Sequence, residues 1–257
     1  PYTTLFLSWY PQSYGSRIQA ANGSVIRLGK HININHFYYS VTADGGGVID
    51  ARQGGVTGTD ASDVNFMARG NGVIVCVPCH ADRAVDMTDP SQAILGECYD
   101  AERGGALYID GSTCINPNVT GVIALSGGHA WAHSVNVSSP LRLQNSTGLW
   151  ATESGMIEAQ DSMLSGMANG IYAQTAGTIE CDRCNIQGSY NDNVVADGGE
   201  VMGTATISRG SQTGYGYHAF HQCQMHLFGV VSPSSVNRLG MFSVQTSGTM
   251  NRASLLV

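Results

Sequence analysis

The stretch from Gly148 to Gly188 contains one short sequence pattern twice. Gly148-Leu149-Trp150-Ala151 is followed by Gly155-Met156-Ile157-Glu158-Ala159, and 22 residues later Gly170-Ile171-Tyr172-Ala173 is followed by Gly177-Thr178-Ile179-Glu180-Cys181. Self-similarity at a fixed period in the twenties is typical of stacked-repeat architectures, in which each repeat packs only on its neighbours. The pattern therefore predicts a chain that winds into coils, with equivalent residues lying above one another.

The same register extends over most of the chain. If the second glycine of each copy is position zero, the equivalent residues are Ser24, Gly47, Gly72, Gly105, Gly128, Gly155, Gly177 and Gly199. Two positions later stand the apolar residues Ile26, Ile49, Ile74, Leu107, Ala130, Ile157, Ile179 and Val201. Position plus four is again apolar or small, whereas plus three is mixed, and this alternation predicts short strands with one buried face. A further copy is expected from Cys223, with Met225 and Leu227 pointing inward.

Repeats of 22 to 33 residues that hold short strands and lack helical periodicity predict an all-β fold. Stacked repeats of this length predict a parallel β-helix of about nine coils. We expect it to be right-handed, because crossover connections between parallel strands are almost always right-handed. Residues 1–22 are expected to form a connector or N-terminal cap and residues 23–231 the β-helix. Residues 232–257 would form a C-terminal cap or a segment that contacts other chains.

Composition restricts the possible partners. Charged residues make up only 12% of the chain, the formal net charge is −7, and Lys30 is the only lysine. Binding to phosphates requires clustered Lys and Arg, so no nucleic-acid partner is expected. No run of 18 apolar residues is present, so we expect no membrane insertion. No signal-peptide pattern is present and the chain begins with Pro1, so we expect a processed chain or a piece of a longer one. The Gly-rich runs precede neither a Lys nor a helix, and no cofactor is expected.

The seven cysteines include two Cys-x-x-Cys pairs, Cys76/Cys79 and Cys181/Cys184. Two such pairs suggest a four-thiolate zinc site. However, both pairs occupy positions plus four and plus seven of their repeats and lie four coils apart, roughly 19 Å along the axis. We therefore predict buried thiols that fill the core and no metal site, with a local disulfide or a local metal as the alternatives.

One outward column carries the residue types of a functional face. Position plus three stacks Tyr108, Trp131, Glu158 and Glu180 on four successive coils, and Trp150 and Tyr172 are expected beside them. Glu158 and Glu180 would lie about one strand spacing apart, roughly 5 Å, where like charges repel. Solvent, a proton, a cation or a ligand must offset that repulsion.

Three interpretations of this column remain open. The carboxylates could simply be solvated or lie at an interface. The aromatic residues Tyr108, Trp131, Trp150 and Tyr172 could bind a glycan, since aromatic faces stack on sugar rings. Finally, Glu158 and Glu180 could be the acid and the nucleophile of a retaining glycosidase, whose carboxyl groups lie about 5 to 5.5 Å apart.

The pattern Asp44-Gly45-Gly46-Gly47-Val48-Ile49-Asp50-Ala51, repeated as Asn169-Gly-Ile-Tyr-Ala with Gly177-Thr-Ile-Glu, resembles the right-handed β-helix of bacteriophage tail fibres and tailspikes. The resemblance covers about residues 23–230. It implies a homotrimer in the virion tail, outside the cell, that contacts other phage tail proteins and binds a host-surface polysaccharide. Some members cleave that polysaccharide. A bacterial surface adhesin is the alternative, because adhesins share the pattern.

Overall fold

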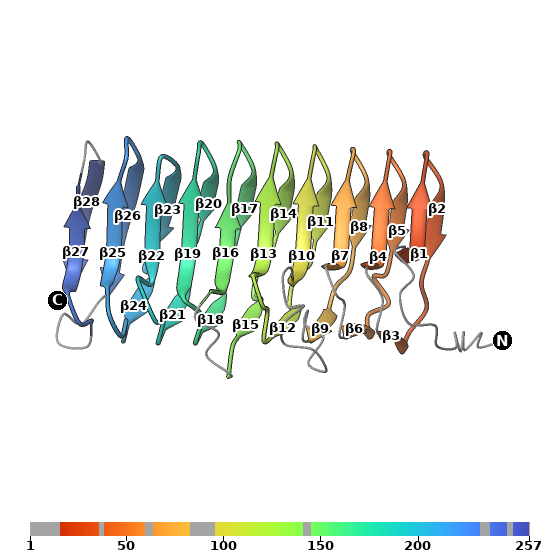
Figure 1. Cartoon of the computed structure of the whole chain (residues 1–257), viewed down its shortest axis with the longest axis horizontal. Helices are drawn as coiled ribbons and strands as arrows, with labels where there is room; N and C mark the ends of the chain where they lie inside the picture. Colours follow the sequence, from red (N-terminus) through yellow and green to blue (C-terminus); the bar gives the residue numbers. More distant parts are fainter. Residues whose placement is uncertain are drawn as a thin grey trace.

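The computed structural model describes residues 16–35, 39–59, 64–82, 96–140, 145–231, 237–245 and 249–256. Within these ranges every regular element is a β-strand, and no helix is present that could cross a membrane. The strands form three parallel ladders that run the length of the molecule, here called ladders 1, 2 and 3 (Figure 1).

From β1 to β24, successive strands of the chain join ladder 1, then ladder 2, then ladder 3, and the order repeats. Ladder 1 comprises β1 (Ser16–Ala21), β4 (Tyr39–Asp44), β7 (Val64–Arg69), β10 (Glu97–Glu102), β13 (Thr120–Leu125), β16 (Thr147–Ala151), β19 (Asn169–Gln174), β22 (Val194–Asp197), β25 (Tyr215–Phe220) and β27 (Gly240–Val244). Ladder 2 comprises β2 (Val25–Arg27), β5 (Val48–Asp50), β8 (Val73–Val75), β11 (Ala106–Tyr108), β14 (His129–Trp131), β17 (Met156–Glu158), β20 (Thr178–Glu180), β23 (Glu200–Thr204), β26 (Gln224–Val231) and β28 (Thr249–Leu256). Ladder 3 comprises β3 (Ile32–Asn35), β6 (Val56–Thr59), β9 (Cys79–Asp82), β12 (Thr113–Ile115), β15 (Asn136–Ser138), β18 (Met163–Ser165), β21 (Asn185–Gln187) and β24 (Ile207–Arg209).

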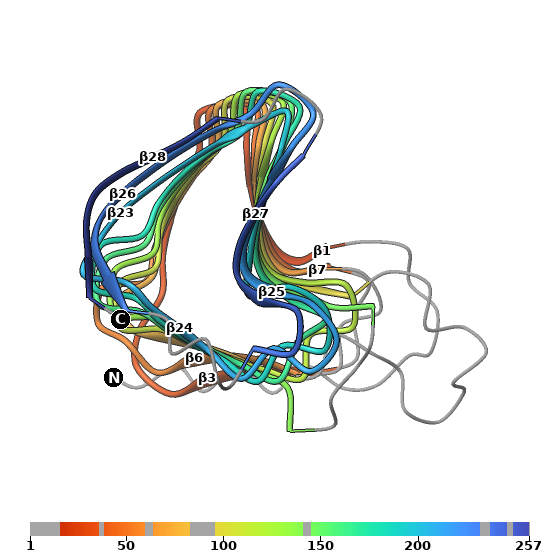
Figure 2. The same ribbon diagram turned by 90° about the vertical axis from the view of Figure 1, so that its left-hand side faces the viewer.

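The fold is a right-handed parallel β-solenoid. Strands β1 to β24 make eight complete three-strand coils, and β25 to β28 continue ladders 1 and 2. Figure 2 looks along the axis from the C-terminal end: the chain runs counterclockwise from ladder 1 through the top corner to ladder 2 while it advances toward the viewer, which is right-handed winding. The predicted fold class is confirmed.

The core has the register that the repeats predicted. Ile157 pairs with Ile179 across neighbouring coils, and both side chains are fully buried. Met225 and Leu227 of β26 are buried in the same way, as expected for the copy without glycine. Alternation thus places one apolar column from each ladder on the axis of the solenoid, where the coils share one continuous core.

The top corner between ladders 1 and 2 is exceptionally tight. A column of nine fully buried alanines precedes it on ladder 1: Ala20, Ala43, Ala68, Ala101, Ala124, Ala151, Ala173, Ala196 and Ala219. A Cβ added to Gly155 would lie closer than 3.0 Å to the carbonyl of Ala124 in the preceding coil, and the same holds at Gly47, Gly72, Gly105, Gly128 and Gly177. Position zero therefore requires glycine because the backbone of the neighbouring coil occupies the space of a side chain.

The first and last coils show where this requirement relaxes. Ser24 stands at position zero in the first coil, and no earlier coil among the described residues packs against it. Cys223 holds the equivalent position between β25 and β26, where its side chain is buried.

The solenoid extends beyond the expected limits of the repeats. Strand β1 at Ser16–Ala21 pairs with β4, although these residues were assigned to the connector, and residues 1–15 lie outside the described part. At the other end β27 pairs with β25 and β28 with β26, so ladders 1 and 2 continue into the segment expected to be a cap. Residues 83–95, between β9 and β10, also lie outside the described part.

The cysteines are all in the core, but not all are thiols. Disulfides join Cys76 to Cys79 and Cys98 to Cys114. The remaining three, Cys181, Cys184 and Cys223, are free and buried. The prediction of core-filling thiols is therefore confirmed for Cys181 and Cys184. It is wrong for Cys76 and Cys79, which form the local disulfide that was the alternative.

Replacing Gly155 by Ala tests the corner. The added Cβ forces the two coils apart, and we expect a loss of roughly 3 kcal/mol in unfolding free energy, or about 6–12 °C in Tm. Thermal unfolding monitored by circular dichroism measures the change. Gly29→Ala is the matched control, since an added Cβ there meets nothing within 4 Å; equal Tm values for the two variants would contradict the role of the corner.

Candidate functional site

The predicted outward column lies on the outer face of ladder 2. Tyr108, Trp131, Glu158 and Glu180 are successive register partners and are all partly exposed. The rings of Tyr108 and Trp131 are parallel within 3° and their centroids lie 4.3 Å apart. The imidazole of His129, two residues before Trp131 on the same strand, also stacks on the indole, and the ring centroids lie 3.5 Å apart.

Two histidines offset the repulsion between the stacked glutamates. His129 Nε2 lies 2.9 Å from Glu158 Oε1, and His133 Nε2 lies 4.0 Å from Glu158 Oε2. Asp110 Oδ1 lies 3.2 Å from His133 Nδ1 and orients that ring. Partial burial, followed by repulsion from Glu158, raises the pKa of the Glu180 carboxyl. The Glu180 carboxyl therefore takes up a proton more readily than an ordinary glutamate carboxyl does.

The structure does not bring Trp150 and Tyr172 to this column. They are register partners on β16 and β19 of ladder 1, with ring centroids 6.2 Å apart. Figure 2 shows that the outer faces of ladders 1 and 2 point in different directions on either side of the top corner. The six predicted site residues thus form two separate groups, four on ladder 2 and two on ladder 1.

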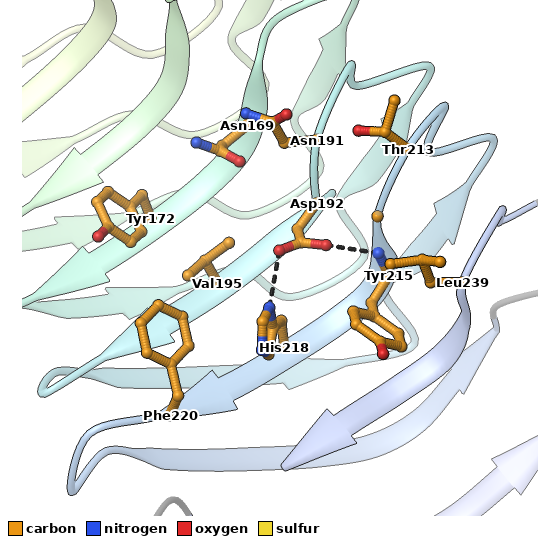
Figure 3. Close-up of a pocket in the computed structure, with 11 residues that line it drawn as sticks. Asn169, Tyr172, Asn191, Asp192, Val195, Thr213, Tyr215, His218, Phe220 and Leu239 are labelled. Carbon is orange, nitrogen blue, oxygen red and sulfur yellow. Dashed lines mark hydrogen bonds and ion pairs between the residues drawn. The ribbon is translucent and has the colours of Figure 1, made fainter. Parts of the chain in front are cut away.

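A shallow groove of about 360 Å³ lies on the outer face of ladder 1, toward the C-terminal end. Tyr172, Val195 and His218 form its floor as register partners on β19, β22 and β25, while their neighbours Ile171, Val194 and Tyr217 point into the core. The lining residues are Asn169, Tyr172, Asn191, Asp192, Val195, Thr213, Gly214, Tyr215, His218, Phe220 and Leu239 (Figure 3). We call this surface the ladder 1 groove.

Asp192 fixes one side of the ladder 1 groove. Its Oδ2 lies 2.8 Å from His218 Nδ1, and its Oδ1 accepts a hydrogen bond from the Tyr215 backbone N–H (Figure 3). Gly214 makes this possible, because a Cβ there would lie closer than 3.0 Å to Asp192 Oδ1. Asp192 and His218 each retain 16% side-chain exposure, so the pair is held in place and still reached from the groove.

A second carboxylate fixes the other side. The Tyr172 hydroxyl donates a 2.9 Å hydrogen bond to Asp197 Oδ2, and His221 Nδ1 lies 2.7 Å from Asp197 Oδ1. Burial, together with the hydrogen bond to Asp197 and its negative charge, raises the pKa of the Tyr172 hydroxyl well above its usual range. Tyr172 therefore remains a neutral ring with a fixed orientation.

The rim of the groove is held by a buried amide network. Asn193 Nδ2 donates to the Ser208 hydroxyl and to Asn237 Oδ1, and Asn237 Oδ1 also accepts from the Ser211 backbone N–H. These contacts join residues of three successive coils beside the groove. The groove walls are thus pre-formed by the solenoid.

Sequence reasoning found Tyr172 and missed most of the groove. Asp192, Thr213 and Gly214 belong to the corner loops before β22 and β25, where the repeat has no regular period. Alternation counted back from Cys223 predicts that His218 faces outward and that His221 faces inward. His218 does face outward, but the prediction for His221 is wrong, because His221 lies in the turn after β25 with a positive φ of 54° and 61% side-chain exposure. Among the described residues, no group of three or more His, Cys, Asp or Glu is arranged to hold a metal ion.

Comparisons with other proteins add little. No protein-family model matches the chain, and no curated protein matches it. Among solved structures, the chain is similar to a TibC-catalysed, hyperglycosylated fragment of TibA, residues 55–350, with a TM-score of 0.35 and 14% sequence identity over 94% of this chain and 92% of that chain. So distant a likeness carries no argument about function, and none of these comparisons identifies a bacteriophage protein.

Replacing Glu180 by Gln tests the electrostatics of the ladder 2 column. A carboxyl whose pKa is raised on folding stabilises the fold below its unfolded pKa and loses this contribution as the pH rises through the folded value. Glu180→Gln should therefore raise Tm by about 1–3 °C at pH 7 and leave it unchanged below about pH 4. Calorimetry at both pH values measures this, with Glu153→Gln in an exposed turn as the control; an equal gain at both pH values would disprove the explanation.

Proposed function

We propose that this solenoid is a structural and receptor-recognition component of a bacteriophage tail and that it binds a host-surface glycan in the ladder 1 groove. The observation that carries the proposal is the lining of that groove. The groove is lined both by the aromatic rings of Tyr172, Tyr215 and Phe220 and by the polar side chains of Asn169, Asn191 and Asp192. Aromatic faces pack on the apolar faces of sugar rings, and amides and carboxylates bond their hydroxyls.

The shape of the groove also suits a polymer. It is shallow and crosses three successive coils, so an extended chain could lie along the surface instead of entering a closed cavity. The hydrogen bonds that hold Tyr172, Asp192 and His218 exist before any ligand binds. Binding then requires little ordering of side chains, which otherwise costs about 0.5–1.5 kcal/mol for each side chain that is fixed.

The assembly is part of the same proposal. The resemblance to tail fibres implies a homotrimer in the virion tail that contacts other phage tail proteins. A bacterial surface adhesin could use the same groove in the same way. Immunogold labelling of virions and of bacterial cells separates the two sources.

Groove variants test glycan binding. Tyr172→Ala and Phe220→Ala should each weaken binding to host-surface polysaccharide about 10-fold, because each removes an aromatic contact worth more than 1 kcal/mol at the centre of a binding surface. Biolayer interferometry on immobilised polysaccharide measures the change. Trp131→Ala, on the outer face of ladder 2, is the matched control and should bind as wild type; a loss in Trp131→Ala alone would move the site to ladder 2.

A second candidate function is endo-glycosidic cleavage of the polysaccharide on the ladder 2 face. The favouring observation is the asymmetry of the glutamates: Glu158 is paired with His129, while Glu180 has a raised pKa. These environments suit Glu180 as the acid and Glu158 as the nucleophile, the reverse of the order taken from the sequence.

Reducing-sugar release from host polysaccharide tests this candidate. A retaining glycosidase with Glu180 as its acid would lose at least about 100-fold of its rate in Glu180→Gln, since general acid catalysis contributes about 10² to 10⁴. His226→Gln, on β26 of the same ladder, is the control. No release by the wild-type protein would eliminate the glycosidase and leave recognition.

A further inference from the structure

We infer that the ladder 1 groove selects uncharged glycans and rejects polysaccharides that carry uronic acids or other carboxylates. This inference rests on the proposed function of the groove and names its ligand class. It follows from the charges that face the groove.

The described lining residues of the groove include a carboxylate and no permanent cation. Asp192 lines it directly, and Asp197 lies behind Tyr172 at 17% side-chain exposure. No Lys or Arg is among the lining residues described above. The two imidazole rings nearest these carboxylates, His218 and His221, each face one of them: His218 faces Asp192 and His221 faces Asp197.

The carboxylates retain capacity for ligand hydroxyls. Each oxygen of Asp192 accepts one hydrogen bond within the protein, from His218 or from the Tyr215 backbone, and a carboxylate oxygen accepts two. A sugar hydroxyl that donates to the remaining position forms a charge-assisted hydrogen bond, about twice as strong as a neutral one. A sugar carboxylate in the same place could donate nothing and would be repelled.

The size of the discrimination follows from the distances. A ligand carboxylate about 5 to 6 Å from Asp192 or Asp197, at the dielectric of a partly exposed site, is disfavoured by a factor of about 10 to 100. The aromatic contacts with Tyr172, Tyr215 and Phe220 are the same for both kinds of ligand, so affinity and charge selectivity can be separated by mutation.

The test compares a panel of uronic-acid capsular polysaccharides with the same polymers after chemical reduction of the carboxyl groups to alcohols. The backbone and linkages are unchanged, so any difference reports the charge. We expect the reduced polymers to bind at least 10-fold more tightly to the wild-type protein. Asp197→Asn should narrow this ratio several-fold, because it removes one charge and keeps an acceptor for the Tyr172 hydroxyl.

Glu200→Gln is the matched control, since it removes the same charge from β23 on ladder 2 and should keep the wild-type ratio. Equal binding of native and reduced polymers would overturn the selectivity while the proposed function stands. Binding of neither form would overturn the proposed function itself. Tighter binding of the native acidic polymers would show that the groove carries the opposite preference.

Discussion

The close approach of each coil to the alanine carbonyl of the coil before it is the constraint on which this fold depends. This close approach leaves no room for a side chain at position zero, and a buried alanine occupies the inward position before it. Six consecutive corners therefore have an alanine followed four residues later by a glycine. The Gly155 N–H closes the turn on the Thr152 carbonyl, and the Gly177 N–H closes the next one on Gln174. Because each corner packs on the corner of the preceding coil, the strands before and after the corners keep the same register from coil to coil.

A common register converts sequence periodicity into surface columns. Residues that face outward from one ladder line up along the axis at the strand spacing, roughly 4.8 Å. That spacing stacks the Tyr108 and Trp131 rings, and it also forces Glu158 next to Glu180. The groove has a different origin: its floor is a ladder column, but its walls are the corner loops that lead into β22 and β25. Recognition surfaces in this fold therefore form where a regular column meets irregular loops.

The sequence predicted the parts of the molecule that obey this constraint. The inward column through Ile157 and Ile179 and the outward column through Glu158 and Glu180 are both placed correctly, because period-2 alternation fixes which face a strand residue takes. The backbone conformation of the corners could not be predicted in the same way. Glu153 and Ser154 adopt φ values of 50° and 64°, a conformation that favours glycine, and only the packing of neighbouring coils explains them. Asp192 and Gly214 lie in loops without a period, so their pairing with His218 could not be read from spacing.

The choice of histidine as the partner of carboxylates suits a rigid recognition surface. The chain has a single lysine, and among the described residues five carboxylates face imidazole rings. The pairs are Asp110 with His133, Glu158 with His129, Asp192 with His218, Asp197 with His221 and Glu200 with His226. In each case the two residues belong to neighbouring coils, so the contact also holds the coils together. A lysine in the same position would lose about 2 kcal/mol of rotamer entropy on being fixed, whereas an imidazole ring has only two side-chain torsions. Planar rings also fit the strand spacing, as Tyr108 and Trp131 do on neighbouring strands. The polar groups of the groove are consequently ordered by the same stacking that builds the core, and a ligand meets a surface whose geometry the fold has already set.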